Sequence, residues 1–575
     1  MSSTDAVSYL DRYDALGDDL KAKAGLASRW IRTDWRPFFK ELREKRPIFK
    51  TPTFTFVTKF ADVTEVLSRE KVFTVRPYAP HMDPVVGPFM LARDATPINW
   101  RERGIMQAVL KPEDLPRVRE TAGRLADEAL DAAAAQGRIE GVSKLGRYVP
   151  LRIVGEYFGF PGPDLASMYR WSKATQTNMF KNLQNDPAIH QAAVQAGQEM
   201  KAYLTGLLAE KRAAVATGSG NAAQDTFSRL VRTHFPPELE FDDARILSNV
   251  MGLLVGTGET SSQAIVQSLE QILLRPEIHA QAVAAAADPD PSKFDRYVWE
   301  GLRLNPINPL IFRLSVEDYT LAAGTERETL IPAGTLVFAC TASAVFDDDV
   351  VPDPDEFKTD RPDFISLHFG YGHHICLGKY VGYVMIPEVI RRVLLRPGVH
   401  LLPPPEGSID FQGGPFPERF EFAFGGKVST GSDPASEVST MSDPGSEVLK
   451  TLDDYASAFL TLAPENTLPY FCLPMMYVAD AGVFVFDTDE TLRGFLTKFC
   501  TGMKALKYAK VDFSGREVTM LNAVTALVTF KVIRFSEEGN EIGRLVGAYT
   551  FRKDADRWKI IVAVLLAEAT GKAHG

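Results

Sequence analysis

The strongest chemical signal in the chain is a cysteine set among glycines. The stretch reads Phe369-Gly-Tyr-Gly372-His-His374-Ile-Cys376-Leu-Gly378 and fits the pattern Phe-x-x-Gly-x-His/Arg-x-Cys-x-Gly. In a chain of this composition, a chance match has a probability on the order of one in ten thousand. A thiolate is a soft metal ligand, and glycine lets a backbone turn tightly and approach a flat partner closely. The stretch therefore predicts a metal-bound thiolate at this position.

Two other interpretations of this cysteine are open. A lone cysteine is usually a buried structural residue, and the two neighbouring histidines could form a His-His-Cys metal site with Cys376. That metal site lacks a fourth ligand at a plausible spacing. The remaining cysteines, Cys340, Cys472 and Cys500, form no CxxC pair and therefore no disulfide framework.

Charged motifs upstream of the cysteine provide independent support. Glu300-Gly-Leu-Arg303 places a carboxylate and a guanidinium one helical turn apart, a pair that is by itself usually a solvated surface contact. Arg313 follows, and then Phe357-Lys-Thr-Asp-Arg361. Taken with the cysteine stretch, this order of motifs resembles the cytochrome P450 family. The resemblance implies that Glu300, Arg303 and Arg361 form a buried structural network.

The resemblance also implies a fold and a cofactor. Residues 1–427 are expected to form a mainly α cytochrome P450 fold with small β-sheets. The cofactor is haem b (iron protoporphyrin IX), with Cys376 as the iron ligand and Phe369 against the ring. Backbone N–H groups near the sulfur would keep it ionised, and an anionic sulfur donates electron density to the iron.

Three cationic residues are implied as partners of the haem propionates. They are His374, Arg313 and Arg103, the last within Asn99-Trp-Arg-Glu-Arg103, where Asn99 is short for such a contact. After the cysteine, the family's Ala-Arg-x-Glu is replaced by Gly382-Tyr-Val-Met. This departure is expected to alter helix packing on the proximal side, where an electron donor would dock.

A long apolar pattern from Phe241 to Leu274 predicts a core helix, interrupted by Gly256-Thr257-Gly-Glu259-Thr260-Ser. A glycine inside a helix costs about 1 kcal/mol, which invites a functional explanation. The segment resembles the family's distal helix, although Thr257 stands where the family usually has glycine. The resemblance implies that Glu259 and Thr260 relay protons to bound oxygen. The alternative is a kinked packing helix whose hydroxyl is satisfied within the helix.

A compositional break divides the chain. Residues 428–447 read VSTGSDPASEVSTMSDPGSE, a tandem ten-residue repeat with almost no apolar side chains. Such a sequence buries too little to offset the entropy of ordering, so it predicts a flexible linker between domains at 1–427 and 448–575.

Composition indicates a folded protein without nucleic-acid or membrane partners. The 575 residues are 45% hydrophobic, and 64 basic against 74 acidic residues give a formal charge of −10. This balance excludes global disorder and a basic nucleic-acid footprint. The first thirty residues are polar, and no apolar stretch is long enough for a span, so we expect a cytoplasmic protein.

The last 128 residues belong to a different fold class. A helix predicted at 448–462 precedes strands predicted at 517–521, 526–535, 544–552 and 558–566. This order resembles the cone-shaped α+β fold of nuclear transport factor 2, which ketosteroid isomerase and the SnoaL-type polyketide cyclases share. Tyr455, Tyr477 and Asp480 are candidates for facing its apolar pocket, although such residues are more often surface or core residues. The only histidine after the linker is His574, which argues against an Asp-His dyad and favours binding or dimerisation over catalysis.

These features together predict a haem-thiolate monooxygenase of secondary metabolism that uses O2 to oxidise a lipophilic small molecule. The chain lacks a dinucleotide fingerprint, a flavin-binding segment and iron–sulfur cysteines, so electrons are expected from a ferredoxin and its ferredoxin reductase. The C-terminal domain is expected to bind a ligand, to form a homodimer or to perform a second tailoring step. The alternatives are a peroxide-driven or isomerising haem-thiolate enzyme, and a haem-binding sensor or scaffold.

Overall fold

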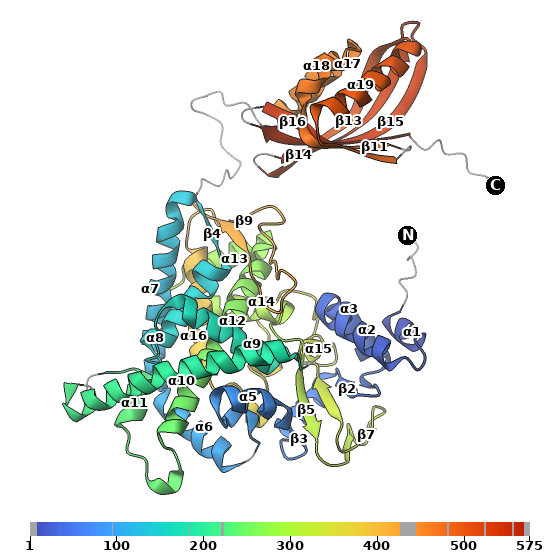
Figure 1. Cartoon of the computed structure of the whole chain (residues 1–575). Helices are drawn as coiled ribbons and strands as arrows, with labels where there is room; N and C mark the ends of the chain where they lie inside the picture. The colour runs from blue at the N-terminus through green and yellow to red at the C-terminus, as the bar shows by residue number, and fades with distance from the viewer. Residues whose placement is uncertain are drawn as a thin grey trace. The chain divides into compact units, whose positions relative to one another are not determined.

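The computed structural model divides into two compact units, Met1–Val428 and Ser429–Gly575 (Figure 1). It describes residues 8–94, 96–182, 185–219, 223–425, 444–479, 482–522, 525–554 and 557–567. Most of the predicted linker, residues 428–443, lies outside this range. Residues 444–447, which the sequence assigned to the linker, form the first turn of helix α17 (Pro444–Leu460).

The first unit is mainly helical. None of the described helices is both long and apolar enough to cross a bilayer. The helices are α1 (Tyr9–Asp14), α2 (Leu20–Thr33), α3 (Trp35–Lys45), α4 (Phe60–Ser68), α5 (Ala79–Val86), α6 (Pro97–Val109), α7 (Leu115–Ala133), α8 (Tyr148–Glu156), α9 (Leu165–Phe180), α10 (Pro187–Ala216), α11 (Thr226–Arg232), α12 (Asp243–Leu273), α13 (Pro276–Ala286), α14 (Pro291–Leu304), α15 (Thr341–Ala344) and α16 (Lys379–Leu394).

Small sheets complete the first unit. A five-stranded sheet has the order β1-β2-β8-β5-β3, a three-stranded sheet the order β4-β10-β9, and β6 and β7 form a hairpin. The strands are β1 (Ile48–Lys50), β2 (Phe54–Val57), β3 (Phe73–Thr74), β4 (Arg138–Glu140), β5 (Ile311–Ser315), β6 (Tyr319–Leu321), β7 (Thr329–Ile331), β8 (Leu336–Ala339), β9 (His400–Leu401) and β10 (Glu421–Ala423).

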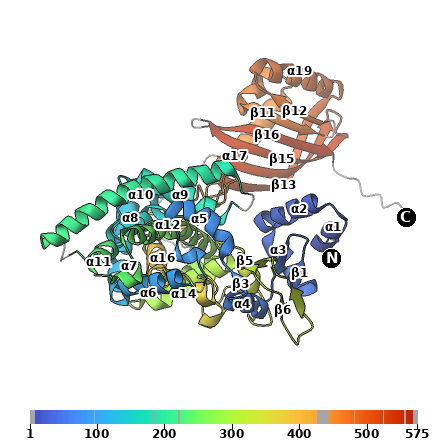
Figure 2. The ribbon, with the colours of Figure 1, turned by 60° about the horizontal axis from the view of Figure 1, so that its bottom comes forward.

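Helix α12 is the central element of the first unit. The Asp242 side chain caps it by accepting a hydrogen bond from the Arg245 backbone N–H. The helix packs against α8, α9, α14 and α16, which buries most of its side chains. It ends at Leu273, just before Arg275, whose α conformation Pro276 disfavours. Helix α10 lies along α9 and α5 (Figure 2).

The second unit is a six-stranded sheet covered on one face by helices (Figure 1). The strand order is β12-β11-β16-β15-β14-β13, antiparallel except for the parallel pair β11 and β16. Its further elements are α18 (Pro464–Thr467), β11 (Phe471–Ala479), β12 (Gly482–Phe486), α19 (Asp489–Ala505), β13 (Tyr508–Asn522), β14 (Thr525–Ser536), β15 (Glu541–Asp554) and β16 (Arg557–Ala567).

Alternation along the strands separates the two faces of this sheet. On β14, Val528, Phe530 and Val532 are buried and pack with Leu452 of α17 and Leu496 of α19. The helices therefore cover the inner face, and the residues between these positions lie on the outer face.

Both predicted fold classes are confirmed: the first unit is mainly helical with small sheets, and the second is a sheet-rich α+β unit. Helix α12 closely matches the predicted core helix. It is nevertheless continuous through Gly256-Thr-Gly-Glu-Thr, where the sequence suggested an interruption. Strand β13 begins at Tyr508, nine residues before the predicted Glu517, because its pairing with β14 extends to Ser536.

Candidate active site

Cys376 lies in a loop that leads into helix α16. The Cys376 backbone N–H donates to the Phe369 carbonyl at 2.9 Å, which closes the loop. Gly372 adopts φ = +69°, and a Cβ there would lie 2.4 Å from the Leu67 carbonyl oxygen, so only glycine fits. The helix begins three residues after the cysteine, at Lys379.

The Cys376 thiol is accessible although protein atoms surround it closely. Burial raises the pKa of this thiol, while hydrogen bonds from the Gly378 and Lys379 backbone N–H groups and the charge of Arg103 act in the opposite direction. The N-terminus of a sixteen-residue helix also favours negative charge. The loop thus presents a sulfur with several features that stabilise its anion.

The Phe369 ring lies against the start of α16. Its centroid is 4.8 Å from that of Tyr383 and 5.6 Å from that of Trp299. A Cβ on Gly382 would lie 3.0 Å from this ring, tighter than most carbon contacts. The departure at Gly382-Tyr383 from the family's sequence therefore accommodates the aromatic ring that precedes the cysteine.

Two of the predicted propionate partners are buried and make no hydrogen bond to a carboxylate within the described residues. Arg313 on β5 is 4% exposed and hydrogen-bonds to the Phe312 carbonyl at 2.9 Å and to the Tyr78 hydroxyl. His374 Nε2 has no hydrogen-bond partner, and the Asp94 carboxylate lies 3.8 Å away. Burial lowers the pKa of both side chains. Within the described residues, neither makes a hydrogen-bonded ion pair.

Arg103 on α6 is half-buried and donates to the carbonyl of Ile375, the residue before the cysteine. Asn99, one turn earlier on α6, has its Oδ1 2.7 Å from His373 Nε2 and donates to the Met90 and Arg93 carbonyls. Asn99 therefore helps to hold the cysteine loop through His373, and Arg103 contacts the residue directly before the cysteine.

On helix α12, the Gly256 and Thr260 positions are accessible although the helix is otherwise largely buried. The Thr260 hydroxyl donates to the Gly256 carbonyl, one turn back, and the helix is continuous through this stretch. Gly258 has a packing role, because a Cβ there would lie 2.0 Å from the Ser172 hydroxyl of α9. The accessible stretch of α12 is thus bordered by a tightly packed face.

Glu259 is 1% exposed and forms an ion pair with Arg147, whose Nη2 lies 3.1 Å from its Oε2. Arg147 also pairs with Glu418 at 3.0 Å and donates to the Pro417 carbonyl at 2.8 Å. Burial raises the pKa of Glu259, and the Arg147 charge opposes this shift. The structure thus places Glu259 in a buried ionic network and gives Thr260 an intrahelical bond.

The predicted network of Glu300, Arg303 and Arg361 is confirmed. Glu300 accepts from Arg303 at 2.7 and 2.8 Å and from Arg361 Nε at 2.9 Å, and all three side chains are buried. The Lys358 backbone N–H adds a bond to Glu300 at 2.9 Å. This cluster joins α14 to the segment that precedes the cysteine loop.

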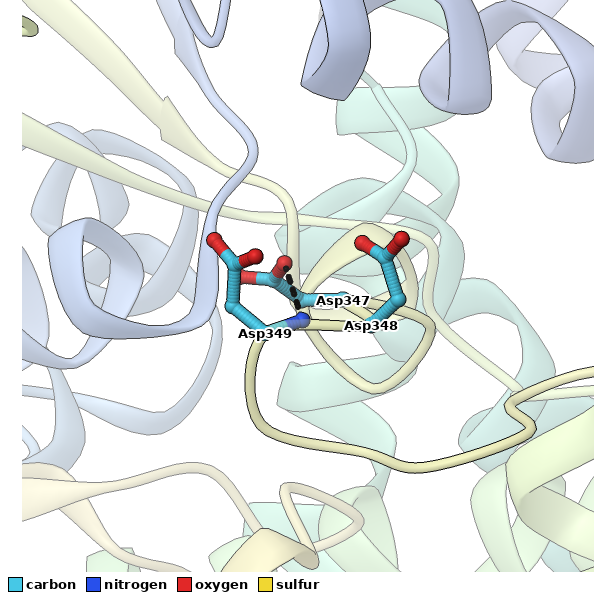
Figure 3. A group of neighbouring side chains, drawn as sticks. All are labelled: Asp347, Asp348 and Asp349. Carbon is cyan, nitrogen blue, oxygen red and sulfur yellow. Dashed lines mark hydrogen bonds between the residues drawn. The ribbon is translucent and has the colours of Figure 1, made fainter.

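The residues around the cysteine fit a haem. An iron needs an accessible thiolate, and two propionates need buried donors that are not already hydrogen-bonded to a carboxylate, which Arg313 and His374 provide. A second acidic group, Asp347, Asp348 and Asp349, follows α15 (Figure 3). Lys59 Nζ lies 2.8 Å from Asp347 and 2.7 Å from Asp349, so a protein cation already pairs with two of the three carboxylates.

Comparison with known families identifies both units. Residues 294–408 match the family "Cytochrome P450", and residues 446–568 match "NTF2-like protein (DUF6841)". The first unit is a cytochrome P450 domain. The match includes the Glu300 network and the Cys376 loop, and it places the domain in a family of haem-iron monooxygenases.

Relatives of the P450 domain are bacterial monooxygenases. The chain is 30% identical over 282 residues to the cytochrome P450 monooxygenase PikC of Streptomyces venezuelae. The aligned region covers 49% of this chain and only 61% of PikC. It is 24% identical to the steroid C26-monooxygenase of Mycolicibacterium smegmatis, covering 66% of this chain and 90% of that protein. It is 27% identical to the mycinamicin IV hydroxylase/epoxidase of Micromonospora griseorubida, covering 63% and 88%.

Solved structures show the same fold. Cytochrome P450 CYP109Q5 from Chondromyces apiculatus has a TM-score of 0.58 at 23% identity, covering 69% of this chain and 96% of that chain. CalO2 has a TM-score of 0.59 at 21% identity, covering 69% and 97%.

Two functional residues, Arg147 and Arg534, were not predicted from the sequence. Arg147, the partner of Glu259, lies 112 residues before it, and no local pattern connects them.

In the second unit, the inner face of the sheet encloses a cavity that Tyr455 and Tyr477 line, as the sequence suggested. Arg534 also lines this cavity. The sequence signal for Arg534 is a charged residue within the alternating apolar pattern of β14. Asp480 and His574 lie outside the described residues.

Proposed function

We propose that the P450 domain is a haem-thiolate monooxygenase that binds haem b through Cys376 and uses O2 to oxidise a lipophilic small molecule. The observation that carries the proposal is the accessible Cys376 thiol together with two buried groups, Arg313 and His374, that make no hydrogen bond to a carboxylate within the described residues. Haem b held at this thiolate would supply reductive activation of O2, and electron donation from sulfur favours O–O cleavage.

The propionates would receive hydrogen bonds from Arg313 and His374. A guanidinium in so enclosed a position carries a desolvation cost that a carboxylate offsets, and a charged hydrogen bond of this kind contributes about 1.5–3 kcal/mol. Arg103, which holds the Ile375 carbonyl, would support the loop beneath the cysteine and lie within reach of the haem edge.

Glu259 and Thr260 would move protons on the distal side. The Thr260 hydroxyl donates its hydrogen to Gly256, so its oxygen can accept a hydrogen bond from a water molecule. Burial raises the pKa of Glu259, so its carboxyl group exchanges protons closer to neutral pH than an ordinary glutamate. A rotation of Glu259 away from Arg147 would connect the carboxyl group with the Thr260 hydroxyl.

Electrons would come from a separate ferredoxin and its reductase. Exposed aromatic side chains surround the cysteine loop: Phe364 is 64%, Tyr371 39% and Tyr380 60% exposed. Lys379 lies beside Tyr380, with its ammonium 5.4 Å from that ring. An apolar surface with a cation fits the docking of an acidic electron carrier close to Cys376.

The substrate would be lipophilic, as the name of one relative, a steroid C26-monooxygenase, also suggests. Aromatic side chains support this class, because the Tyr78 and Phe312 rings stack at 4.2 Å and Phe180 lies 5.8 Å from Tyr78. Tyr78 directly precedes α5, Phe312 lies on β5 next to Arg313, and Phe180 is the last residue of α9.

The test uses testosterone and mycinamicin IV as probes. Each is added to the full-length haem protein, the spin-state change is recorded, and oxidised products are measured by mass spectrometry with ferredoxin, reductase and NADPH. The proposal expects product that depends on O2 and the reductase. Equal rates with hydrogen peroxide alone would favour the peroxide-driven alternative, and spectral binding of both probes without any product would favour a sensor.

The second unit would bind a ligand and join two copies of the chain. Its outer sheet face carries exposed apolar side chains on four neighbouring strands: Met476 (39%), Val483 (61%), Val485 (57%), Val546 (43%) and Leu566 (39%). Register pairs Met476 with Val485 and Val546 with Leu566, so they share one face. A second copy would cover this self-complementary apolar face.

Sedimentation measures the dimer directly. Val485→Lys should convert a dimer into a monomer, whereas Lys510→Gln on β13 should leave the dimer intact. A wild-type chain that sediments as a monomer at micromolar concentration would contradict this part of the proposal.

A further inference from the structure

Arg534 stands at a position where the sheet pattern calls for an apolar residue. On β14 the inner face is formed by Val528, Phe530 and Val532, and Arg534 is the next residue in this alternation. Its side chain lines the cavity between the sheet and the helices. A guanidinium placed among core side chains is costly unless a charged partner satisfies it.

The surroundings of Arg534 are aromatic. Its Cζ atom lies 5.6 Å from the centre of the Phe499 ring of α19. Four tyrosines lie close enough that its charge lowers their pKa values, although burial, the larger effect, raises them. They are Tyr455, Tyr477, Tyr508 and Tyr549, and all line the cavity. Their hydroxyl groups are therefore neutral donors at neutral pH.

The described lining of the cavity carries no anionic side chain. None of these lining residues is an aspartate, glutamate or histidine, and Arg534 forms no ion pair with a described residue. Other arginines of this unit differ: Arg493 pairs with Glu465, and Arg516 lies 2.6 Å from Asp453. The cavity opens to solvent and leaves about 40 Å³ for the centres of water-sized molecules. The cavity thus combines an apolar body with a single cation and several hydroxyl donors.

We propose that this cavity binds a lipophilic carboxylate, with Arg534 as the partner of the carboxylate and the aromatic side chains around the hydrocarbon body. This inference deepens the proposed binding role of the second unit and rests on it. Because the lining offers no carboxylate or imidazole to abstract a proton, the site binds its ligand without enolising it. Tyrosine hydroxyls next to Arg534 would donate to the second carboxylate oxygen.

The probes are two acid–alcohol pairs, 2-naphthoate with 2-naphthalenemethanol and octanoate with octanol. Each is titrated calorimetrically into the full-length haem protein with 4-phenylimidazole on the iron, so that the P450 site is occupied. At least one acid should bind about tenfold or more tightly than its alcohol, as expected for a charged hydrogen bond. Comparable affinities for acid and alcohol, or no saturable binding of either acid, would overturn the proposal.

Variants assign the preference to one side chain. Arg534→Gln should abolish the acid preference while the alcohol binds as before, and Arg534→Lys should retain most of it. Arg552→Gln, which removes an exposed cation of β15, is the matched control and should change nothing. If the preference for the acid over the alcohol falls equally in Arg534→Gln and Arg552→Gln, the assignment to Arg534 is contradicted. These titrations do not depend on monooxygenase activity. A failure of the proposed monooxygenase function would therefore leave the acid preference intact, and the two proposals can fail independently.

Discussion

The buried carboxylate of Glu300 provides a quantitative test of how the P450 domain is held together. Glu300 accepts four hydrogen bonds, two from Arg303, one from Arg361 and one from the Lys358 backbone N–H, at 2.7–2.9 Å. The Glu300, Arg303 and Arg361 side chains are 5%, 3% and 8% exposed. Glu300→Gln keeps the shape but removes the anion that both guanidinium groups contact, and turns an amide donor toward other donors.

The expected loss in the free energy of unfolding is about 3–5 kcal/mol, the cost of leaving buried charges without their partner. The assay is urea unfolding of the full-length haem protein, followed by Soret absorbance and by circular dichroism. Glu128→Gln is the matched control, because its pair with Arg124 is almost half exposed on both sides and should contribute less than about 1 kcal/mol. A Glu300→Gln protein as stable as Glu128→Gln would refute the reasoning.

The same variant has a defined pH dependence. Burial by itself raises the pKa of Glu300, but the hydrogen bonds and charges of Arg303 and Arg361 outweigh it, so the pKa lies below the ordinary 4.5. A lowered carboxyl pKa contributes stability that is present above the unfolded-state value and lost as pH falls through the folded-state value. The difference between wild type and Glu300→Gln should therefore be constant from pH 5 to 7, roughly, and shrink below about pH 4.5.

Three further predictions concern the haem site. Arg313→Gln should release haem about tenfold faster to excess apomyoglobin, because a buried propionate loses its charged donor, and an unchanged rate would remove Arg313 from the haem site. Arg147→Met should raise the pKa of Glu259 further and shift the pH profile of product formation upward, whereas Arg147→Lys should shift it less; superimposable profiles would exclude Glu259 from proton transfer. Thr260→Val should lower the product formed per O2 consumed without changing substrate-binding spectra, and full coupling in this variant would show that the hydroxyl only caps Gly256.

The sequence predicted those features that depend on local spacing. The cysteine motif, the Glu300-x-x-Arg303 turn and the strands of the second unit each have a short-range pattern, and the structure contains them. Arg147 could not be found in this way, because packing of α8 against α12 brings it to Glu259. The apolar pattern of α12 is interrupted at its glycines, yet the helix is continuous there, and Gly258 packs against Ser172 of α9.

Arg534 shows the complementary case. Its charge interrupts an apolar alternation that is visible in the sequence, yet the same pattern would suit an arginine at a strand end that turns to solvent. Only the surrounding aromatic side chains of α17, α19 and β15 show that it faces a cavity. The start of helix α17 at Pro444 likewise depends on structure, because proline suits a first helical turn but also suits the repeat before it.

The central claim is that Cys376 ligates haem iron as a thiolate. The most direct measurement is the absorption spectrum of the reduced, carbon monoxide-bound full-length protein, compared with that of Cys376→Ala. Thiolate ligation predicts a strongly red-shifted Soret band in the wild type that is absent from the variant. An unshifted band that is identical in both proteins would contradict it.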